Sequence, residues 1–371
     1  MQLTSTNKTS ADKADDTKRE SYDMVVFCHL RWGFVYQRPQ HIISRIAKDK
    51  KVLLIEEPWL RDDTRESRLE IIDENLHILQ PNVMRIEDIG GILAQYCDKN
   101  IETGWFYSAS FIPLLEYFSF NTVIYDCMDE LSMFKGAPES LIEQEKYLMS
   151  LADVVFTGGK SLYESKAQFH DNVYCFPSSV DRVHFAKALN GIAVPSDMPS
   201  GKPVVGYFGV IDERINMELV NEVALLRPEI NFVMIGPLAK IGEHELANQP
   251  NIYYAGMKDY LDLPAYLKGF DVAMMPFALN DATRYISPTK TLEYMAAGKP
   301  IVSTPIIDVV RDYSGCVSIV ETAAQFATAI DAALQADPLV RSAQYNAILE
   351  TTSWDATVQK MQAIMTNTVT A

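Results

Sequence analysis

The sequence predicts an α/β protein with two doubly wound parallel sheets, and three observations lead to this prediction. Short apolar stretches alternate with helical segments along the whole chain, which is typical of parallel sheets. The length of 371 residues exceeds one ordinary hydrophobic core and fits two domains. Residues 189–203 (LNGIAVPSDMPSGKP) hold three prolines and two glycines, a composition typical of a linker. We therefore expect one domain at 23–188 and a second at 204–350.

The first domain should contain seven short strands with helices between them. Residues 1–22 come before it and are rich in Ser, Thr, Asp and Lys, so we expect a disordered tail there. Apolar runs of four to seven residues between turn residues are typical of buried parallel strands. The expected strands are 24–30, 51–55, 76–79, 104–107, 122–125, 154–157 and 173–176. The expected helices are 39–47, 89–96, 111–118, 138–151 and 161–169.

The second domain repeats this scheme. Its expected strands are 204–208, 232–235, 252–255, 272–276, 301–304 and 318–320. Before the fifth strand, Ser287 can act as N-cap, Pro288 suits the first helical position, and Gly298 can end the helix in a left-handed conformation. The last helix carries an apolar stripe at spacings of 4, 3 and 4, which predicts that it packs across a neighbour. The stripe consists of Trp354, Val358, Met361 and Met365.

Composition excludes several classes of protein. A net charge of −16 opposes general binding of nucleic acid, which needs a basic surface. Five scattered cysteines without a Cys-x-x-Cys pair indicate reduced thiols, so we expect a cytoplasmic protein. No apolar run approaches the ~20 residues of a membrane span, and no secretory signal is recognisable.

Residues 31–51 are locally basic, with six basic residues and one acid. Such a patch could meet an anionic substrate or an anionic membrane surface. The alternative is a solvated face, which we favour for Arg45 and the lysines.

Ligands of open parallel sheets bind beyond the carboxyl ends of the strands, and the first strand ends in polar residues. An arginine at a helix N-terminus is electrostatically unfavourable, so an anion held between Arg31, Arg38 and the helix start would relieve that cost. His29 could line the same ligand or be a buried core histidine. The candidate acceptor or phosphate ligands at this end are Arg31, Trp32, Gln37, Arg38 and His41.

Acidic residues follow the strand at 122–125. Asp126 could act as a base, accept sugar hydroxyls or stabilise a developing cation. For Asp129 and Glu130 we favour helix capping over catalysis. No acids have the Asp-x-Asp spacing that often holds a metal and a diphosphate, so we expect no metal.

The first strand of the second domain ends at Gly209. The Gly-x-Gly-x-x-Gly fingerprint is absent, which disfavours nicotinamide and flavin cofactors. Gly209 would let a ligand approach the backbone, and Arg214 could either reach a phosphate or form a salt bridge with Asp212 or Glu218. Backbone groups near Met257 could form hydrogen bonds with the edge of a nucleotide base. Alternatively, these residues only form a turn.

The helix after Ser287 offers an anion site. Its unsatisfied N–H groups and Lys290 suit a diphosphate. Thr289, Lys290 and Glu293 share one face, so the Glu293 carboxylate could accept hydrogen bonds from ribose hydroxyls. A surface Lys–Glu pair on a capped helix is the alternative.

The motifs resemble those of the GT-B glycosyltransferases, in the large retaining family that includes glycogen and sucrose synthases. The subgroup is similar to teichuronic-acid-type bacterial glycosyltransferases, and the resemblance covers about residues 23–366. The matching segments are HLRWGFVYQRPQH, YDCMDELSMF, TGGKSLYESK, PSSVDRVHF, GYFGVIDERIN, SPTKTLEYMAAGKPIVSTP and the late Ser353-Trp354-Asp355.

The resemblance implies two Rossmann-like domains facing a cleft, with the nucleotide-sugar donor on the C-terminal domain and the acceptor on the N-terminal one. We expect residues 351–371 to return to the first domain. Glu293 matches the second of two family glutamates, the one that contacts ribose. Tyr285 replaces the first, which usually contacts the donor sugar, and Arg284 beside it is a further phosphate candidate.

We therefore expect sugar transfer from a UDP-linked donor to a free or lipid-linked saccharide of a bacterial surface polysaccharide. The resemblance implies retention at the anomeric carbon without a metal or other cofactor, with His29 or Asp126 lining the sugar. The protein could work at the inner face of the cytoplasmic membrane through residues 31–51. Open alternatives are an inverting transferase with Asp126 as base, a nucleotide-sugar 2-epimerase, and a catalytically silent scaffold that binds a nucleotide sugar.

Overall fold

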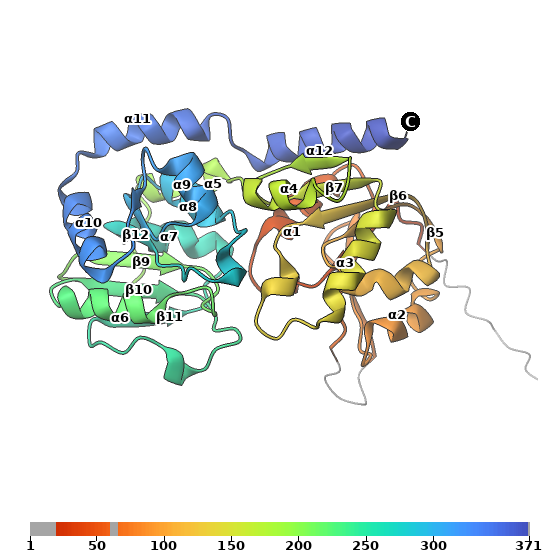
Figure 1. Cartoon of the computed structure of the whole chain (residues 1–371), viewed down its shortest axis with the longest axis horizontal. Helices are drawn as coiled ribbons and strands as arrows, with labels where there is room; N and C mark the ends of the chain where they lie inside the picture. The colour runs from red at the N-terminus through yellow and green to blue at the C-terminus, as the bar shows by residue number, and fades with distance from the viewer. Residues whose placement is uncertain (1–19, 60–65, 370–371) are drawn as a thin grey trace, which may run out of the picture.

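The structure, a computed structural model, describes residues 20–59 and 66–369, which form two lobes side by side (Figure 1). Each lobe contains one mainly parallel sheet between helices, so the predicted fold class is confirmed. Most of the tail predicted at 1–22 lies outside the described residues. Its end is ordered, because Tyr22 is buried and its hydroxyl lies 2.7 Å from His77 Nδ1.

The N-terminal sheet has the strand order β3-β4-β2-β1-β5-β6-β7-β8, and only β3 is antiparallel. All seven predicted strands are present, with small differences at their ends. The short edge strand β3 was not predicted, because its four residues are exposed or half-buried and contain no apolar run. The bounds are β1 Met24–Cys28, β2 Val52–Glu56, β3 Arg68–Ile71, β4 Leu76–Gln80, β5 Asn100–Phe106, β6 Ser119–Cys127, β7 Val154–Thr157 and β8 Val173–Cys175.

Side chains of β1 alternate between two core clusters on opposite faces of this sheet. Val25 and Phe27 belong to one cluster, and Met24 and Val26 belong to the other. The helices of this lobe are α1 Arg38–Ile46, α2 Ile86–Leu93, α3 Ser140–Leu151 and α4 Lys160–Lys166, with a 3-10 turn at Leu131–Met133; α5 Arg182–Phe185 and the 3-10 turn Ala186–Leu189 follow and pack in the C-terminal lobe. The helix predicted at 111–118 is instead the 3-10 helix Ala109–Glu116, which contains Pro113 and therefore lacks one N–H donor.

The C-terminal sheet is fully parallel, with the order β11-β10-β9-β12-β13-β14, and contains all six predicted strands. Its strands are β9 Val204–Phe208, β10 Asn231–Ile235, β11 Ile252–Gly256, β12 Val272–Met275, β13 Ile301–Ser303 and β14 Ser318–Ile319. Its helices are α6 Met217–Leu226, α7 Leu263–Lys268, α8 Thr289–Ala296, α9 Ile307–Tyr313, α10 Ala323–Gln335 and α11 Pro338–Leu349, with 3-10 turns at Glu243–Glu245, Tyr260–Asp262 and Asp281–Thr283.

The chain passes between the lobes twice. Val180, Phe185 and Met198 pack in the C-terminal core, so the first crossing lies before residue 180, earlier than the linker predicted at 189–203. The second crossing leads to α12 (Trp354–Val369), which lies over the N-terminal lobe and packs on α1 (Figure 1). Trp354 and Met361 are buried in an N-terminal cluster, as the apolar stripe predicted.

An aspartate of the C-terminal lobe caps a helix of the N-terminal lobe. Asp308, in α9, accepts hydrogen bonds from the backbone N–H groups of Lys160 (2.8 Å) and Ser161 (3.1 Å) at the start of α4. A Cβ at Gly159 would lie 2.6 Å from the Asp308 carboxylate, so the glycine permits this approach. This contact ties the two lobes together.

Replacing Asp308 by Ala is expected to lower the free energy of unfolding by about 1–2 kcal/mol, because two buried N–H groups lose their cap. Urea denaturation measures this change. Asp312→Ala is the control, since Asp312 forms an ion pair with the exposed Lys160 ammonium and the loss of such a surface pair should cost less than about 1 kcal/mol. Equal losses in both variants would contradict the capping role.

Candidate functional site

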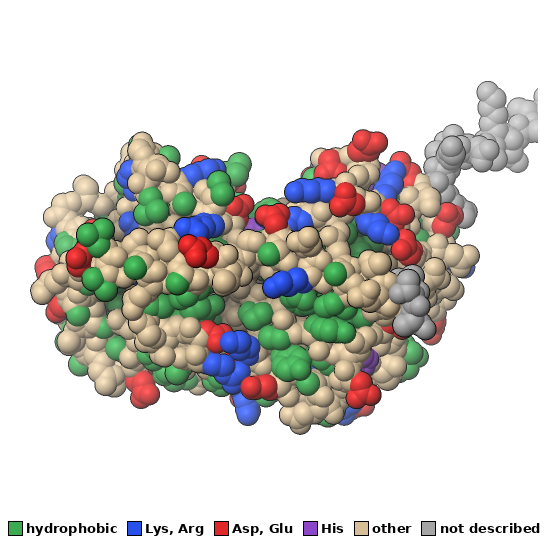
Figure 2. Space-filling view, turned by 90° about the horizontal axis from the view of Figure 1, so that it is seen from above, with side chains coloured by type: hydrophobic (Ala, Val, Ile, Leu, Met, Phe, Trp, Pro, Cys, Tyr) green, Lys and Arg blue, Asp and Glu red, His purple; other side chains and the backbone are tan. Residues whose placement is uncertain are grey.

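Three connected cavities lie between the carboxyl ends of the two sheets, and Figure 2 shows the notch between the lobes on one face. We name them the Glu293 cavity (about 210 Å³), the α8-start cavity (about 120 Å³) and the His29 cavity (about 450 Å³). Val35 and Gly209 line the first two, and Asp129 and Arg214 line the last two. The cavities therefore form one cleft with walls from both lobes.

The start of α8 faces this cleft without a side-chain cap. The prediction that Ser287 is the N-cap is wrong: the helix begins at Thr289, and Pro288 is the N-cap residue with an extended backbone. Ser287 lies before the helix, and its carbonyl accepts a hydrogen bond from the Ser178 hydroxyl of the N-terminal lobe. Ser287, Thr289 and Lys290 line the α8-start cavity, so the first N–H groups of the helix are available to an anion. Gly298 has a φ of 68°, as predicted for the end of the helix.

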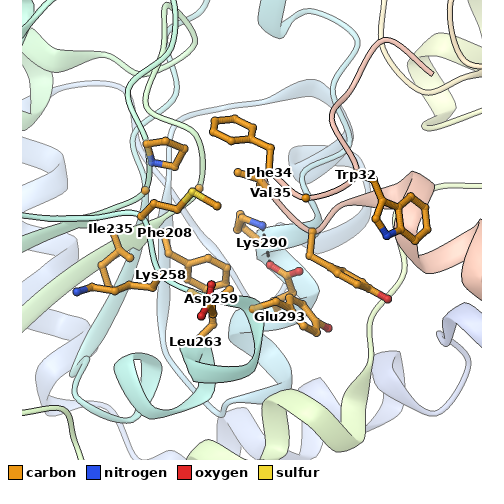
Figure 3. Close-up of a pocket in the computed structure, with 17 residues that line it drawn as sticks. Trp32, Phe34, Val35, Phe208, Ile235, Lys258, Asp259, Leu263, Lys290 and Glu293 are labelled. Carbon is orange, nitrogen blue, oxygen red and sulfur yellow. Dashed lines mark hydrogen bonds and ion pairs between the residues drawn. The ribbon is translucent and has the colours of Figure 1, made fainter. Parts of the chain in front are cut away.

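Lys290 and Glu293 form a partly buried pair in the Glu293 cavity. Lys290 Nζ lies 2.8 Å from Glu293 Oε2 and 4.6 Å from the centre of the Phe208 ring. The Glu293 side chain is 6% exposed, which excludes the alternative of an ordinary surface pair. Figure 3 shows the two side chains between the loop after β1, which carries Trp32 and Phe34, and the ends of the C-terminal strands.

Two glycines without side chains line the Glu293 cavity with their backbone. Gly209 and Gly236 have φ values of 149° and 147° at the ends of β9 and β10. A Cβ on Gly236 would lie 1.8 Å from the Gly209 carbonyl oxygen, so a side chain there requires the backbone to move. The predicted role of Gly209, close approach of a ligand to the backbone, fits this geometry.

Arg214 forms the salt bridge with Asp212 that was one of its two predicted roles, and the other, a phosphate contact, stays a prediction. Its guanidinium forms a bidentate salt bridge with Asp212, with a shortest distance of 2.7 Å, and lies over the Phe134 ring of the other lobe. It nevertheless lines the α8-start and His29 cavities. An anionic ligand in the cleft would therefore meet the Arg214 guanidinium, whose position is already fixed by Asp212.

Asp126 disagrees with its predicted catalytic role. Its carboxylate is fully buried, lines none of the three cavities and receives three hydrogen bonds from Arg38, at 2.8 to 3.2 Å. The remaining Arg38 nitrogen donates to the Phe176 carbonyl at 2.7 Å. Arg38 touches the α8-start cavity, but its donors are occupied inside the N-terminal lobe, so the prediction of a phosphate held between Arg31 and Arg38 is also wrong.

The other ligand residues predicted after the first strand lie in different places. Trp32 lines the Glu293 cavity, and Gln37 lines the α8-start and His29 cavities while capping α1. Arg31 lies outside the three cavities and is paired with Glu56 at 3.0 Å. His41 is buried and stacks on Trp354 with ring centres 4.7 Å apart, so its predicted ligand role is wrong. Burial lowers the pKa of His41 to about 2.

Three further residues were predicted to bind the nucleotide-sugar donor, and only one of them lines the cleft. Met257 lines the Glu293 cavity. Tyr285 packs against an N-terminal core cluster, and Arg284 is exposed with its guanidinium 5.3 Å from the centre of the Tyr285 ring. Neither of these two lines the three cavities, so their predicted donor contacts disagree with this geometry.

His29 lines the cavity named after it, as a ligand-binding role requires. Among the described residues, its Nδ1 atom has no hydrogen-bond partner. Burial lowers the pKa of His29 to about 4, so the imidazole is neutral at pH 7. A neutral imidazole can donate a hydrogen bond to a sugar hydroxyl or accept one from it.

Asp129 is the functional candidate that sequence reasoning missed. It lines both the α8-start and His29 cavities, and burial raises its pKa to about 6 despite the opposing charge of Arg214. The 3-10 turn that follows begins after Glu130 and has no side-chain cap, so the capping role we favoured for Asp129 and Glu130 is wrong. The sequence placed both Asp126 and Asp129 near the end of β6 and could not tell them apart. In the structure they differ, because Asp126 is sealed in the core and Asp129 lines the cleft.

Most of the basic stretch at residues 31–51 is neutralised within the fold. Five of its six basic residues have acidic partners. The pairs are Arg31–Glu56, Arg38–Asp126, Arg45–Asp355, Lys50–Glu102 and Lys51–Glu20. Within the described part of the chain, no helix is both long and apolar enough to cross a membrane, and no three His, Cys, Asp or Glu side chains converge on a metal site.

Comparison with known proteins gives a consistent picture. Residues 202–336 match the family described as glycosyl transferases group 1. A glycosyltransferase of Bacillus subtilis (strain 168), TuaH, whose name places it in teichuronic acid biosynthesis, is 26% identical over 216 residues. That match covers 54% of each chain, so it spans about half the length of the relative.

Solved structures show the fold. A UDP-forming trehalose-phosphate synthase from Burkholderia xenovorans superposes with a TM-score of 0.68 at 13% identity, covering 94% of this chain and 100% of that one. The sucrose-phosphate synthase of Thermosynechococcus elongatus gives a TM-score of 0.69 at 14% identity, covering 94% and 99%. Both of these are GT-B proteins, and at such identities the likeness concerns the fold alone.

Changing Asp126 to Asn is expected to lower the free energy of unfolding by about 3–5 kcal/mol, because Arg38 would keep a buried charge without its partner. Urea denaturation measures this loss. Asp88→Asn is the matched control, since it breaks an exposed Arg–Asp pair and should leave stability nearly unchanged. An Asp126 variant of normal stability that has lost only activity would restore the catalytic role.

The pKa of Asp129 predicts a pH-dependent stability difference. The folded pKa of about 6 exceeds the ordinary value of 3.8, so wild type loses stability, relative to Asp129→Asn, as the pH rises from about 4 to above 6. Thermal unfolding of both proteins between these limits measures the difference. Asp262→Asn, on an exposed residue, is the control; a difference that stays constant with pH would contradict the raised pKa.

Proposed function

We propose that this chain, a GT-B protein whose residues 202–336 form a glycosyl transferases group 1 domain, transfers a sugar from a nucleoside diphosphate sugar to an acceptor glycan. The observation that carries the proposal is the uncapped start of α8 beside the buried Lys290–Glu293 pair, inside a cleft between the lobes. The acceptor is a saccharide of a bacterial surface polysaccharide, in keeping with the name of the Bacillus relative.

The diphosphate belongs at the start of α8. Thr289, Lys290 and Arg214 line this part of the cleft, and the helix start there has no side-chain cap. Helix N-termini favour anions, and a departing diphosphate gains negative charge, so these groups stabilise the leaving group more as the reaction proceeds. This arrangement supplies the charge stabilisation without a metal ion.

The nucleoside belongs in the Glu293 cavity. The Glu293 carboxylate can accept hydrogen bonds from ribose hydroxyls, while the backbone around Gly236 and Met257 lies where a base would end. We propose uridine as the base because the names of the trehalose-phosphate synthases mention UDP formation and bound UDP-2-fluoro glucose. The sugar then points toward Lys290 and the His29 cavity.

The acceptor belongs in the His29 cavity, which is lined mainly by the N-terminal lobe. His29 and Asp129 supply hydrogen-bonding groups there, and Asp129 also touches the α8-start cavity. We propose retention, by attack of the acceptor hydroxyl on the same face of the sugar from which the diphosphate departs. The proton of the acceptor hydroxyl passes to the leaving phosphate oxygen.

Two alternatives give different products. A nucleotide-sugar 2-epimerase would convert the donor without an acceptor, and a silent scaffold would bind the nucleotide but leave the donor unchanged. The inverting alternative with Asp126 as base loses its support, because Asp126 is sealed against Arg38. Analysis of products after incubation with and without acceptor distinguishes transfer from both alternatives.

The first test is nucleotide binding. UDP is expected to raise the melting temperature of wild type more than GDP, ADP or TDP, and Glu293→Gln should weaken UDP binding roughly tenfold or more, since a charged hydrogen bond contributes about 1.5–3 kcal/mol. Glu143→Gln is the matched control, because Glu143 and Lys146 form the same three-residue pair on an exposed helix surface. No stabilisation by any of the nucleotides would overturn the proposal.

A further inference from the structure

A short segment of the N-terminal lobe contacts the C-terminal lobe across the cleft. We call residues 131–137 the bridging segment. Its backbone N–H at Lys135 donates a hydrogen bond to Glu213 Oε1 of the C-terminal lobe at 3.2 Å, and its 3-10 turn contacts the turn at Asp281–Thr283. The segment also forms part of the wall of the His29 cavity. Its lining residues there are Leu131, Phe134, Lys135, Gly136 and Ala137.

The N-terminal lobe fixes the shape of the bridging segment. Just before the segment, the Glu130 carboxylate lies 2.7 Å from Lys166 Nζ, and both side chains are largely buried. Within the segment, the N–H of Ala137 donates to the Phe134 carbonyl at 3.0 Å. Gly136 supplies the left-handed φ of 79° in this turn, which a side chain would disfavour. The position of Phe134 is therefore set by the structure of its own lobe.

Two cations of the other lobe meet the Phe134 ring. The guanidinium carbon of Arg214 lies 5.3 Å from the ring centre, and Lys240 Nζ lies 4.7 Å from it. At these distances the negative face of an aromatic ring attracts a cation. Among the described residues, Lys240 is the one non-glycine residue with a positive φ (59°), and its contacts with Phe134 and Glu213 help to offset the cost of that conformation. One ring thus contacts both cationic residues by which the C-terminal lobe lines the His29 cavity.

Arg214 is the cation of this pair that also lines the α8-start cavity. Its Nε and Nη2 atoms donate to the Asp212 carboxylate at 2.7 to 3.1 Å, which leaves Nη1 as the nitrogen for a phosphate oxygen. Asp212 holds one edge of the guanidinium, and Phe134 adds a contact from the other lobe. A guanidinium that is held in place before binding loses less conformational freedom when it binds a phosphate. Phe134 can therefore affect phosphate binding through Arg214.

We propose that Phe134 is a positioning residue of the donor site, which strengthens the binding of the diphosphate by fixing Arg214. This inference rests on the proposed function, in which the α8-start cavity holds the diphosphate. It adds that the N-terminal lobe contributes to phosphate binding through an aromatic ring rather than through a charge. Because the ring and the guanidinium belong to different lobes, full affinity for the diphosphate requires both lobes.

The test separates phosphate binding from nucleoside binding. Titration calorimetry measures the dissociation constant of UDP, and displacement of UDP measures that of uridine. Phe134→Leu keeps an apolar side chain without the ring, and it should weaken UDP binding about threefold or more while changing uridine binding less than about twofold. Phe134→Tyr keeps a ring and should bind UDP within about twofold of wild type.

A double-mutant cycle tests whether the effect passes through Arg214. In an Arg214→Gln background there is no guanidinium to position, so Phe134→Leu should change UDP binding less than about twofold. Phe120→Leu is the matched control, because Phe120 is a half-buried phenylalanine of the same lobe whose ring packs on Phe106 and Phe118. It should leave UDP binding unchanged.

The outcomes are distinct. Unchanged UDP binding in Phe134→Leu, equal weakening of UDP and uridine binding, or a loss that persists in the Arg214→Gln background would each overturn the positioning role. Each of these results leaves the proposed function standing, because wild type still binds UDP. Absence of UDP binding in wild type would instead overturn the proposed function, on which the inference rests.

Discussion

Two parallel sheets present their carboxyl edges to a single cleft, and this constraint determines where every candidate functional group lies. Each strand is followed by a connection that must turn back toward the amino edge, so the turns after β1, β6, β9 and β10 gather at the cleft. The lobes are joined by two chain crossings and by the Asp308 cap on α4. Groups far apart in sequence, such as Asp129 and Lys290, thereby line one cavity.

Burial then divides the charged residues of the cleft region into structural and functional groups. Arg38 and Asp126 satisfy each other inside the N-terminal lobe, where the low dielectric makes an unpaired charge costly. Arg214 and Lys290 also have acidic partners, but both remain in contact with the cavities. A diphosphate can therefore share these two cations without leaving a buried carboxylate unpaired, because each pair is still partly open to the cleft.

The direction of side chains limits the chemistry of the donor sugar. Tyr285 stands where the resembled family has its first glutamate, yet its ring packs against the N-terminal core. In the function that we propose, contacts to the donor sugar come from other groups, and His29 and Asp129 are polar residues of the His29 cavity that could make them.

The sequence by itself determined the fold class, thirteen of the strands and the importance of the segment around α8, because apolar runs, turn residues and helix signals act locally. It also indicated Lys290 and Glu293, whose three-residue spacing places them on one helix face. It could not separate Asp126 from Asp129, or assign Arg31, Arg38 and His41, since each choice depends on partners distant in sequence: Arg38, Arg214, Glu56, Phe176 and Trp354. Tertiary structure decided these cases, because burial and pairing determine which polar group must be satisfied internally and which is left to a ligand.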